Sequence, residues 1–497
     1  MKKLTSLFIA MIMILLLTAS SMVFSVSAEG AWDGTTAATE FSSGDGTEAS
    51  PYIIATPEQF KLFADLINDA ATNETYNMCW YKLSADIDLG GNLWYRIGVN
   101  STPFSGVFDG DGHTVSNFLI YEHPAALFGN ATNSTIKNLK IDYADICGMD
   151  SCAAGIVANV KSSSSLTIEN CEVGSRVRIM VDSLGNCARV GGIWGDVASN
   201  AIVYASNCIN RGKIVISGNG GNDAGVGGIG GAFRYGYVKK CVNLGSVVST
   251  CDGVKTESAG GILGIVISPI EANEATIENV INCANVIGYT SGGGIIGTIH
   301  SGTANLKITN AFSLTNHISI YADESMALGY GTVIGSLRNE TQTCTLNNVY
   351  SIEIPDVAQI GGAFPVEGTF MSVISSIDAL AATSEYNDIL SLLGIDALTM
   401  PVPPSEETEP DIPTLTPPDE NESESETDPE QGTVPADPVV SDTEPEPTEP
   451  EATNPVTPDT APETEKPSEG GCGSVVASGL AIVAVVALAG IAIRKKN

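Results

Sequence analysis

A short glycine-rich block recurs along most of the chain and limits the folds that the chain can adopt. The intervals between blocks are about 29–38 residues, a period typical of proteins in which each repeat buries its apolar face against its neighbours. We therefore predict a stack of similar units over residues 76–356. The blocks, in forms such as GGIWG, GGIGG, GGILG and GGIIG, end at Gly129, Ala158, Gly195, Gly231, Gly264, Gly297 and Gly335.

Each block is followed, after a polar turn, by a second apolar segment such as LTIENCEV or CTLNNVYSI. In TIENV and LKITN apolar and polar residues alternate, which is the period of a strand with one buried face. Turns rich in Gly, Asn and Ser, without a helical period inside the repeats, favour stacked strands over helix pairs. The expected fold is an all-β parallel solenoid in which equivalent residues of successive coils lie about 4.8 Å apart.

The GGIxG blocks and the strands after them resemble the GLUG-motif repeats of bacterial cell-surface proteins. The stretch SADIDLGG…FSGVFDGDGHTVSNF…ALFG resembles the segment that commonly precedes such repeats. The resemblance covers residues 45–355, with irregular repeats at 153–158 and 331–335. It implies a right-handed parallel β-helix of the pectate-lyase-like superfold, and it implies no catalytic residues.

The two ends of the chain have compositions typical of secretion and membrane anchoring. Residues 1–28 join two lysines to an apolar run that ends in the small-x-small tripeptide VSA, which predicts a signal peptide. Residues 475–493 carry no charge and, as a helix, would be long enough to span a bilayer. The basic tail 494–497 then lies in the cytoplasm. We expect a Gram-positive type of surface protein, anchored by one C-terminal transmembrane helix and without an LPxTG-like sorting sequence.

Residues 401–470 are rich in Pro, Asp and Glu and almost free of large apolar residues, which predicts a disordered stalk. This segment contributes much of the formal net charge of −35, so that charge says little about what the folded part binds. No basic patch is recognisable, which disfavours nucleic acid as a partner.

Two amphipathic segments are expected to cover the ends of the solenoid, where strand edges would otherwise be exposed. In the N-terminal region 29–75, Thr56 as N-cap and Pro57 at the first position predict a helix over 57–70. In the region 357–400, apolar spacing over 374–393 followed by a glycine predicts a C-terminal helical cap.

The stretch PFSGVFDGDGHTVSNF places Asp109, Asp111 and His113 within five residues. Asp-Gly pairs favour a turn between two strands. A calcium loop begins in a similar way but needs a glutamate at its twelfth position, which is Ile120 here. No second His or Cys lies near His113 in the sequence, so we predict a turn and no metal site.

Two matches to G-x-G-x-x-G, GVGGIG and GGGIIG, recur at the repeat period without a following helix, so no nucleotide cofactor is expected. The pairs Asp86/Asp88 and Asp142/Asp145 leave acid–base hydrolysis open. On an isolated solenoid surface such acids are more often only solvated.

Cys171, Cys208, Cys241 and Cys283 are assigned to the same place in successive repeats. We predict a ladder of free, buried thiols, because free cysteine behaves as a small hydrophobic residue. Disulfides between adjacent coils remain the alternative, since the strand spacing permits them. The spacings are unlike those of zinc sites.

This architecture favours a surface-displayed protein for adhesion or for binding a glycan or a host or matrix protein. The candidate contact residues are Tyr235, Tyr237, Tyr289 and Tyr330, which could instead form a stacking ladder. A polysaccharide lyase or glycoside hydrolase of the β-helix type, and a passive envelope protein, remain as alternatives. We assign no catalytic, cofactor or metal residues, and the balance is against an enzyme.

Overall fold

The computed structural model describes twelve segments of the chain, all within one compact unit that ends at Asp419. The predicted signal peptide, stalk, transmembrane helix and basic tail lie outside the described residues. No helix among the described residues is long and apolar enough to cross a membrane. The described segments are 32–149, 152–183, 188–218, 224–250, 257–267, 275–300, 306–320, 327–337, 344–361, 367–368, 371–374 and 384–393.

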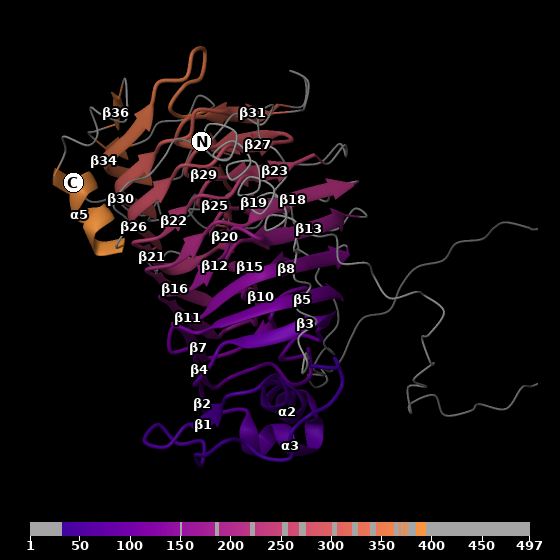
Figure 1. Cartoon of the computed structure of the whole chain (residues 1–497). Helices are drawn as coiled ribbons and strands as arrows, with labels where there is room; N and C mark the ends of the chain where they lie inside the picture. The colour runs from indigo at the N-terminus through magenta and orange to yellow at the C-terminus, as the bar shows by residue number, and fades with distance from the viewer. Residues whose placement is uncertain are drawn as a thin grey trace, which may run out of the picture. The chain divides into compact units, whose positions relative to one another are not determined.

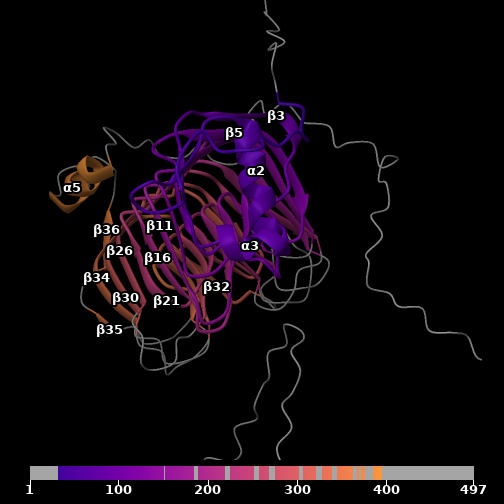
Figure 2. The same ribbon diagram turned by 90° about the horizontal axis from the view of Figure 1, so that it is seen from below.

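The chain winds through four lines of strands that stack from the N-terminal end to the C-terminal end (Figure 1). Every pairing between named strands is parallel and joins one coil to the next, for example β11 to β16 and β16 to β21. The prediction of an all-β stack of parallel strands is therefore confirmed. Seen along the stack, the coils surround a filled core (Figure 2).

The first line contains β1 (Tyr52–Ile54), β2 (Trp80–Leu83), β4 (Val107–Asp109), β7 (Ser134–Lys137), β11 (Ser165–Glu169), β16 (Ile202–Ser206), β21 (Tyr235–Lys239), β26 (Ala275–Asn282), β30 (Leu306–Ser313), β34 (Cys344–Ile352) and β35 (Glu367–Gly368). Strand β36 (Met371–Ile374) pairs with the second half of β34. The second line contains β3 (Ile87–Leu93), β5 (Thr114–Glu122), β8 (Lys140–Met149), β13 (Val177–Ser183), β18 (Lys213–Gly218), β23 (Val247–Ser249), β27 (Val286–Gly288) and β31 (Ile318–Ile320). Between these two lines lie β12 (Glu172–Val173), β17 (Ile209–Asn210) and β22 (Val242–Asn243).

The third and fourth lines are separate sheets of six and seven strands. The third contains β9 (Ala153–Ala154), β14 (Arg189–Gly191), β19 (Ala224–Gly227), β24 (Glu257–Gly260), β28 (Ser291–Gly293) and β32 (Gly329–Gly331). The fourth contains β6 (Phe128–Ala131), β10 (Val157–Val160), β15 (Trp194–Val197), β20 (Gly230–Phe233), β25 (Leu263–Val266), β29 (Ile296–Ile299) and β33 (Ile334–Leu337). The glycine blocks lie at the bend between these two sheets.

Two helices lie across the N-terminal end of the stack (Figure 2). Helix α2 (Pro57–Asn68) begins after Thr56, whose side chain accepts a hydrogen bond from Gln59 N, and it buries one apolar face. Asp69 ends α2 and is also the N-cap of a second helix, α3 (Ala70–Tyr76). The single predicted range 57–70 thus contains one helix and the start of another.

Helix α5 (Ser384–Leu393) is the described helix of the C-terminal region, and it lies beside the last coils (Figure 1). Tyr386 and Leu390 pack against outward-facing apolar residues, and the Tyr386 ring is 5.6 Å from that of Phe312. The last described coils therefore bury apolar side chains on their outer side as well as in their core. Much of the region predicted as a cap, 357–400, lies outside the described residues.

The glycine blocks are explained by a column of buried asparagines inside the stack. Asn210 donates from Nδ2 to Asn243 Oδ1, and Asn243 donates in the same way to Asn282, both at 2.9 Å. Gly228 lies against this column: a Cβ there would be 2.2 Å from Asn243 Cγ and 2.1 Å from the carbonyl oxygen of Gly261. The second glycine of the block is therefore needed because no side chain fits beside the asparagine.

In the last coils the asparagine column changes to serine. Ser313 and Ser351 occupy the asparagine column in successive coils. Beside Ser351 the glycine position is taken by Thr332, which donates from Oγ1 to Ser351 Oγ at 2.9 Å. Beside Ser313 the glycine is retained as Gly294, where a Cβ would lie 2.0 Å from Ser313 Oγ, so the change to serine does not by itself make room for a side chain.

The predicted turn at Asp109–Gly112 is confirmed as the bend between β4 and β5. Asp111 and Gly112 have φ of 50° and 83°, and Asp109 Oδ1 accepts a hydrogen bond from Asp111 N. The two strands do not pair with each other: β4 pairs with β2 and β7, and β5 with β3 and β8. The turn is a corner of a coil and not a hairpin.

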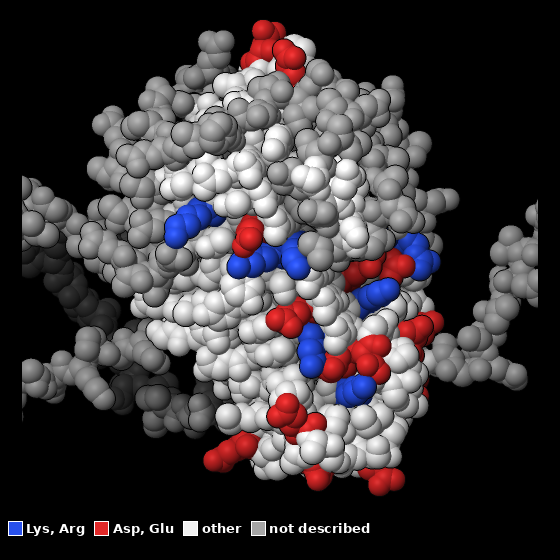
Figure 3. Space-filling view, turned by 90° about the vertical axis from the view of Figure 1, so that its left-hand side faces the viewer, with Lys and Arg blue, Asp and Glu red and all other residues white. Residues whose placement is uncertain are grey.

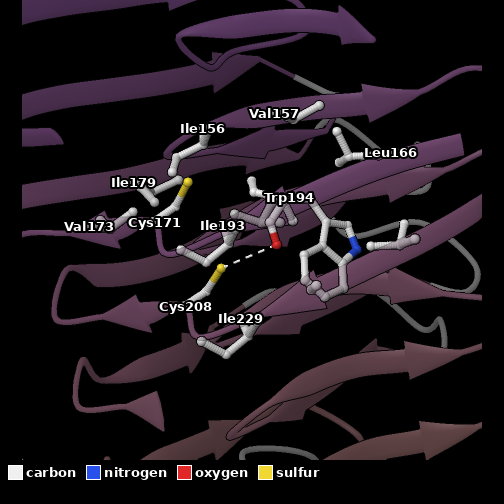
Figure 4. Packing of buried hydrophobic residues seen from close by; sticks show 14 of the residues in the cluster. Ile156, Val157, Leu166, Cys171, Val173, Ile179, Ile193, Trp194, Cys208 and Ile229 are labelled. Carbon is white, nitrogen blue, oxygen red and sulfur yellow. Dashed lines mark hydrogen bonds between the residues drawn. The ribbon is translucent and has the colours of Figure 1, made fainter. Parts of the chain in front are cut away.

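Cys171, Cys208 and Cys241 form a buried column in the core, where Figure 4 shows the first two among Ile156 and Ile193. All eight described cysteines are free thiols. The ladder thiols donate weak hydrogen bonds to backbone carbonyls, as Cys208 Sγ does to Ser206 O at 3.3 Å. Burial raises the pKa of Cys171 and Cys241 well above the ordinary value.

The prediction that Cys283 belongs to this column is wrong. Val242 pairs with Ile281, so the residue in register with Cys241 is Val280. Cys283 lies three positions further on and packs in the outer cluster that α5 covers. Alignment of the repeats on their cysteines alone therefore gives the wrong register at this coil.

The buried thiols predict a loss of stability in alkali. Burial raises the pKa of Cys283 and Cys344 to about 12. Because the folded pKa lies above the unfolded value near 9, their contribution is complete below pH 9 and is lost as the pH rises toward 12. For each thiol the free energy of unfolding should fall by up to about 1.4 kcal/mol per pH unit in this range.

Guanidinium denaturation at pH 8, 9, 10 and 11 measures this decline. The double variant Cys283→Ala/Cys344→Ala is the comparison, because it removes both titrations while tyrosines and lysines still titrate. We expect a shallower decline in the variant. Equal slopes in the two proteins would contradict the burial of the two thiols.

Candidate binding face

The outer surface of β4, β7, β11, β16, β21 and β26 carries two columns of outward side chains, and we call it the tyrosine face. Residues in these strands alternate between the core and this surface, and the parallel register aligns them from coil to coil. One column is mostly hydroxylic and aromatic, and the other is mostly charged. The first contains Thr135, Thr167, Tyr204, Tyr237 and Thr276, and the second contains Lys137, Glu169, Ser206, Lys239 and Glu278.

An aromatic pair forms the centre of the tyrosine face. The rings of Tyr204 and Tyr237 have centroids 5.1 Å apart at an angle of 45°, and Lys239 Nζ lies 5.1 Å from the Tyr237 centroid. These residues line a shallow depression of about 330 Å³ together with Tyr235 and Thr276. Partial burial raises the pKa of Tyr237, so its hydroxyl remains a neutral hydrogen-bond donor and acceptor.

Charges of both signs are interleaved along this side of the molecule (Figure 3). Lys239 pairs with Glu278 at 3.1 Å, and Lys137 pairs with Asp109 at 3.4 Å. Partial burial alone would raise the pKa of the Asp109 carboxyl, but hydrogen bonds, first from the Asn138 amide, and the charge of Lys137 together lower it. These two ion pairs each join one coil to the next.

The structure places the four predicted tyrosines in two different parts of the coil. Tyr235 and Tyr237 lie on β21 and share the depression with Tyr204, although Tyr235 is 3% exposed. Tyr289 is buried just before β28, and Tyr330 is exposed on β32, in the third line of strands. Only the first two are brought together.

Sequence reasoning missed Tyr204 and Lys239. A signal for Tyr204 was present, since Tyr204 and Tyr237 each lie four residues before a ladder cysteine, Cys208 and Cys241. Alignment of the repeats on those cysteines would have placed the two tyrosines side by side. The same alignment would not have identified Lys239 as a binding residue, because many outward positions are charged.

The acids considered for hydrolysis each have a partner of their own. Asp142 receives two hydrogen bonds from the Arg176 guanidinium, at 2.6 and 3.1 Å. Asp145 is fully buried and is held by Arg178 at 2.7 and 2.9 Å. These carboxylates on β8 are thus bound by arginines from the next coil, which is a structural role.

Asp86 and Asp88 are also held by hydrogen bonds from residues of the neighbouring coil. Asp86 accepts from Thr114 N at 2.9 Å and lies 3.2 Å from His113 Nδ1, while Asp88 accepts from Asn117 at 2.9 Å. The hydrogen bond from Thr114 N is the main reason why the pKa of Asp86 is lowered. Within the described residues no group of three or more His, Cys, Asp or Glu side chains is arranged to hold a metal ion.

Comparison with known proteins finds partial similarities. No family model matches, so the resemblance to GLUG repeats stays a prediction. The chain is 30% identical over 175 residues to Halomucin of Haloquadratum walsbyi, which covers 32% of this chain and 2% of that protein. It is 28% identical over 131 residues to a predicted Gly-rich membrane protein of Evansella cellulosilytica, which covers 24% of this chain and 14% of the relative.

The chain thus spans only a small part of the curated relatives that it matches. A solved structure, a proposed immunoglobulin A1 protease from Bacteroides ovatus, superimposes with a TM-score of 0.46 and 20% identity over 71% of this chain and 90% of that one.

Proposed function

We propose that this is a bacterial cell-surface protein whose β-helix displays the tyrosine face for binding extracellular glycans, in the manner of an adhesin. The observation that carries the proposal is the open depression in which Tyr204 and Tyr237 lie side by side under Lys239. Tyrosine offers a rigid apolar ring and a polar tip, so it can hold the C–H face of a sugar ring and bond a hydroxyl. The neighbouring Thr276 adds a further hydroxyl.

The surface location is supported by the sequence and by the relatives. The predicted signal peptide and C-terminal transmembrane helix would place the solenoid outside the cell, held by the acidic stalk. One relative is named Halomucin, and another is named as a Gly-rich membrane protein. A binding role is favoured over hydrolysis because the candidate acids are occupied by arginine, backbone and amide partners.

A glycan array probed with the full-length chain tests this proposal, followed by calorimetry on the best ligand. We expect Tyr237→Ala and Tyr204→Ala each to weaken binding by about tenfold, which corresponds to the loss of one aromatic contact of about 1.4 kcal/mol. Their melting temperatures should change little, because both rings lie on the outer surface.

Tyr121→Ala is the matched control, since Tyr121 is a 38% exposed tyrosine on β5, in a different line of strands. It should bind like the unmodified chain. If no glycan or host or matrix protein binds, the passive envelope role is favoured. Binding that ignores both Tyr204 and Tyr237 would place the site elsewhere.

A further inference from the structure

A column of left-handed residues follows the tyrosine face, where each coil bends away from the first line of strands. All members of the column have φ between 51° and 56°. Asparagine is among the residues that adopt this conformation most readily, whereas a longer side chain is strained in it. Six of the seven members are asparagines and one is a lysine. The column, from the N-terminal coil upward, is Asn138, Asn170, Asn207, Lys240, Asn279, Asn310 and Asn348.

Side-chain amides join the members of this column on either side of the lysine. Asn138 donates to Asp109 at 2.8 Å and Asn170 to Asn138 at 3.0 Å. Further up, Asn310 donates to Asn279 at 2.9 Å and Asn348 to Asn310 at 3.1 Å. Asn207 and Lys240 lie between these two series. A lysine cannot continue the ladder, because its ammonium group donates but accepts no hydrogen bond.

Lys240 therefore weakens the fold in two ways: its backbone is strained and its side chain interrupts the amide ladder. Residues held in an unfavourable backbone conformation are found preferentially where they serve a function. The position of the ammonium group indicates what that function is.

Lys240 lines a second depression, of about 380 Å³, with Lys140 at its other end. The positions in register with Lys140 are Glu172, Ile209 and Val242, so three coil steps, about 14 Å, separate the two lysines along the axis. Glu172 is neutralised by Arg211 at 2.8 Å. In the part of the chain that the structure describes, no ion pair uses Lys140 or Lys240.

The lysine depression adjoins the tyrosine depression at the coils of β16 and β21. Lys240 directly follows Lys239, which lies over Tyr237, and Asn207 follows the last residue of β16, which carries Tyr204. The amides of Asn170 and Asn207 also line it. At physiological ionic strength screening limits the reach of distant charges to about 8 Å, so acidic residues far from the depression contribute little to the potential here.

We propose that the Lys140–Lys240 depression binds the anionic groups, carboxylates or sulfates, of an acidic saccharide, one of whose rings lies on Tyr204 and Tyr237. This inference rests on the glycan-binding function proposed above and adds the ligand class. Ammonium groups and amide N–H groups are the donors that carboxylate and sulfate oxygens accept. Arg211 is already engaged by Glu172, so Lys240, together with Lys140, supplies the selectivity, while the charge of Lys140 also acts on Asp86.

Titration of the full-length chain with three probes tests the inference: oligogalacturonate for carboxylate, dextran sulfate for sulfate, and neutral dextran. The key variant is Lys240→Asn, which gives the column its usual residue. We expect it to bind the preferred anionic probe about five- to tenfold more weakly, as for the loss of one charge-assisted contact, and neutral dextran unchanged. The same variant should melt about 2 °C higher, since strain is relieved and the ladder can continue.

The controls separate this inference from the proposed function. Lys213→Asn changes a lysine on β18, away from both depressions, and should alter neither anion binding nor neutral binding. Unchanged anion binding by Lys240→Asn, or equal affinity of the unmodified chain for neutral and anionic probes, would overturn the anionic site alone. Failure of both Tyr204→Ala and Tyr237→Ala to weaken any probe would overturn the tyrosine face as the glycan site, and the absence of binding to every probe would count against the glycan-binding function itself.

Discussion

Replacing Gly228 by alanine is expected to lower the free energy of unfolding by about 3–5 kcal/mol. The added Cβ would lie 2.1 Å from the Gly261 carbonyl oxygen and 2.2 Å from Asn243 Cγ, so backbone as well as side chain must move. The movement would break the buried bond between Asn243 and Asn282 and leave amide groups without partners. Guanidinium unfolding followed by circular dichroism at 25 °C measures the loss.

Gly112→Ala is the control for this prediction. Gly112 has a φ of 83°, but no atom lies within 4 Å of the position that a Cβ would take. Alanine there should cost only the conformational strain, about 1 kcal/mol. If both variants lose the same stability, the conformation of glycine, and not the space beside the asparagine column, would be the reason for the repeated block.

Phe63→Ala is expected to lower the free energy of unfolding by a similar amount, about 3–5 kcal/mol. Phe63 is fully buried on α2, and its ring lies 4.3 Å from that of Tyr81 and 5.4 Å from that of Phe108. The truncation would leave a cavity between the helix and the first coils. Because α2 lies across the end of the stack, loosening it should also expose strand edges and promote association.

Chemical denaturation gives the stability of the Phe63 variant, and sedimentation velocity detects association. Met78→Ala offers a matched control, because Met78 is a large apolar residue near the same end with 79% exposure. It should change stability by less than about 0.5 kcal/mol. A Phe63 variant as stable as the Met78 variant would show that α2 contributes little to the stack.

The repeat architecture could be predicted because its signals are local. Glycine blocks, polar turns and alternating apolar residues each occur within a few positions, and together they indicate stacked parallel strands. The helix after Thr56 was predictable for the same reason, since its cap and apolar spacing are contiguous. The break at Asp69, which divides that helix from α3, gave no comparable signal.

The register between coils was harder to predict, and the binding face depends on it. Residue type alone aligns Cys283 with Cys241, whereas the strand pairing places Val280 opposite Cys241. Tyr204 was overlooked because its partner Tyr237 is 33 positions away in sequence and adjacent only after stacking. Tyr289 and Tyr330 were selected because they are tyrosines, without a prediction of where each lies in its coil. The structure places both in another part of the coil.

The close packing around the inner glycines has a consequence for how such a chain can diversify. A Cβ at Gly228 would lie 2.2 Å from Asn243 Cγ, and one at Gly294 would lie 2.0 Å from Ser313 Oγ. The outward columns lack this constraint, since their side chains meet solvent and one another. Single substitutions can therefore change the displayed surface, while the inner glycine positions of the middle coils tolerate no side chain.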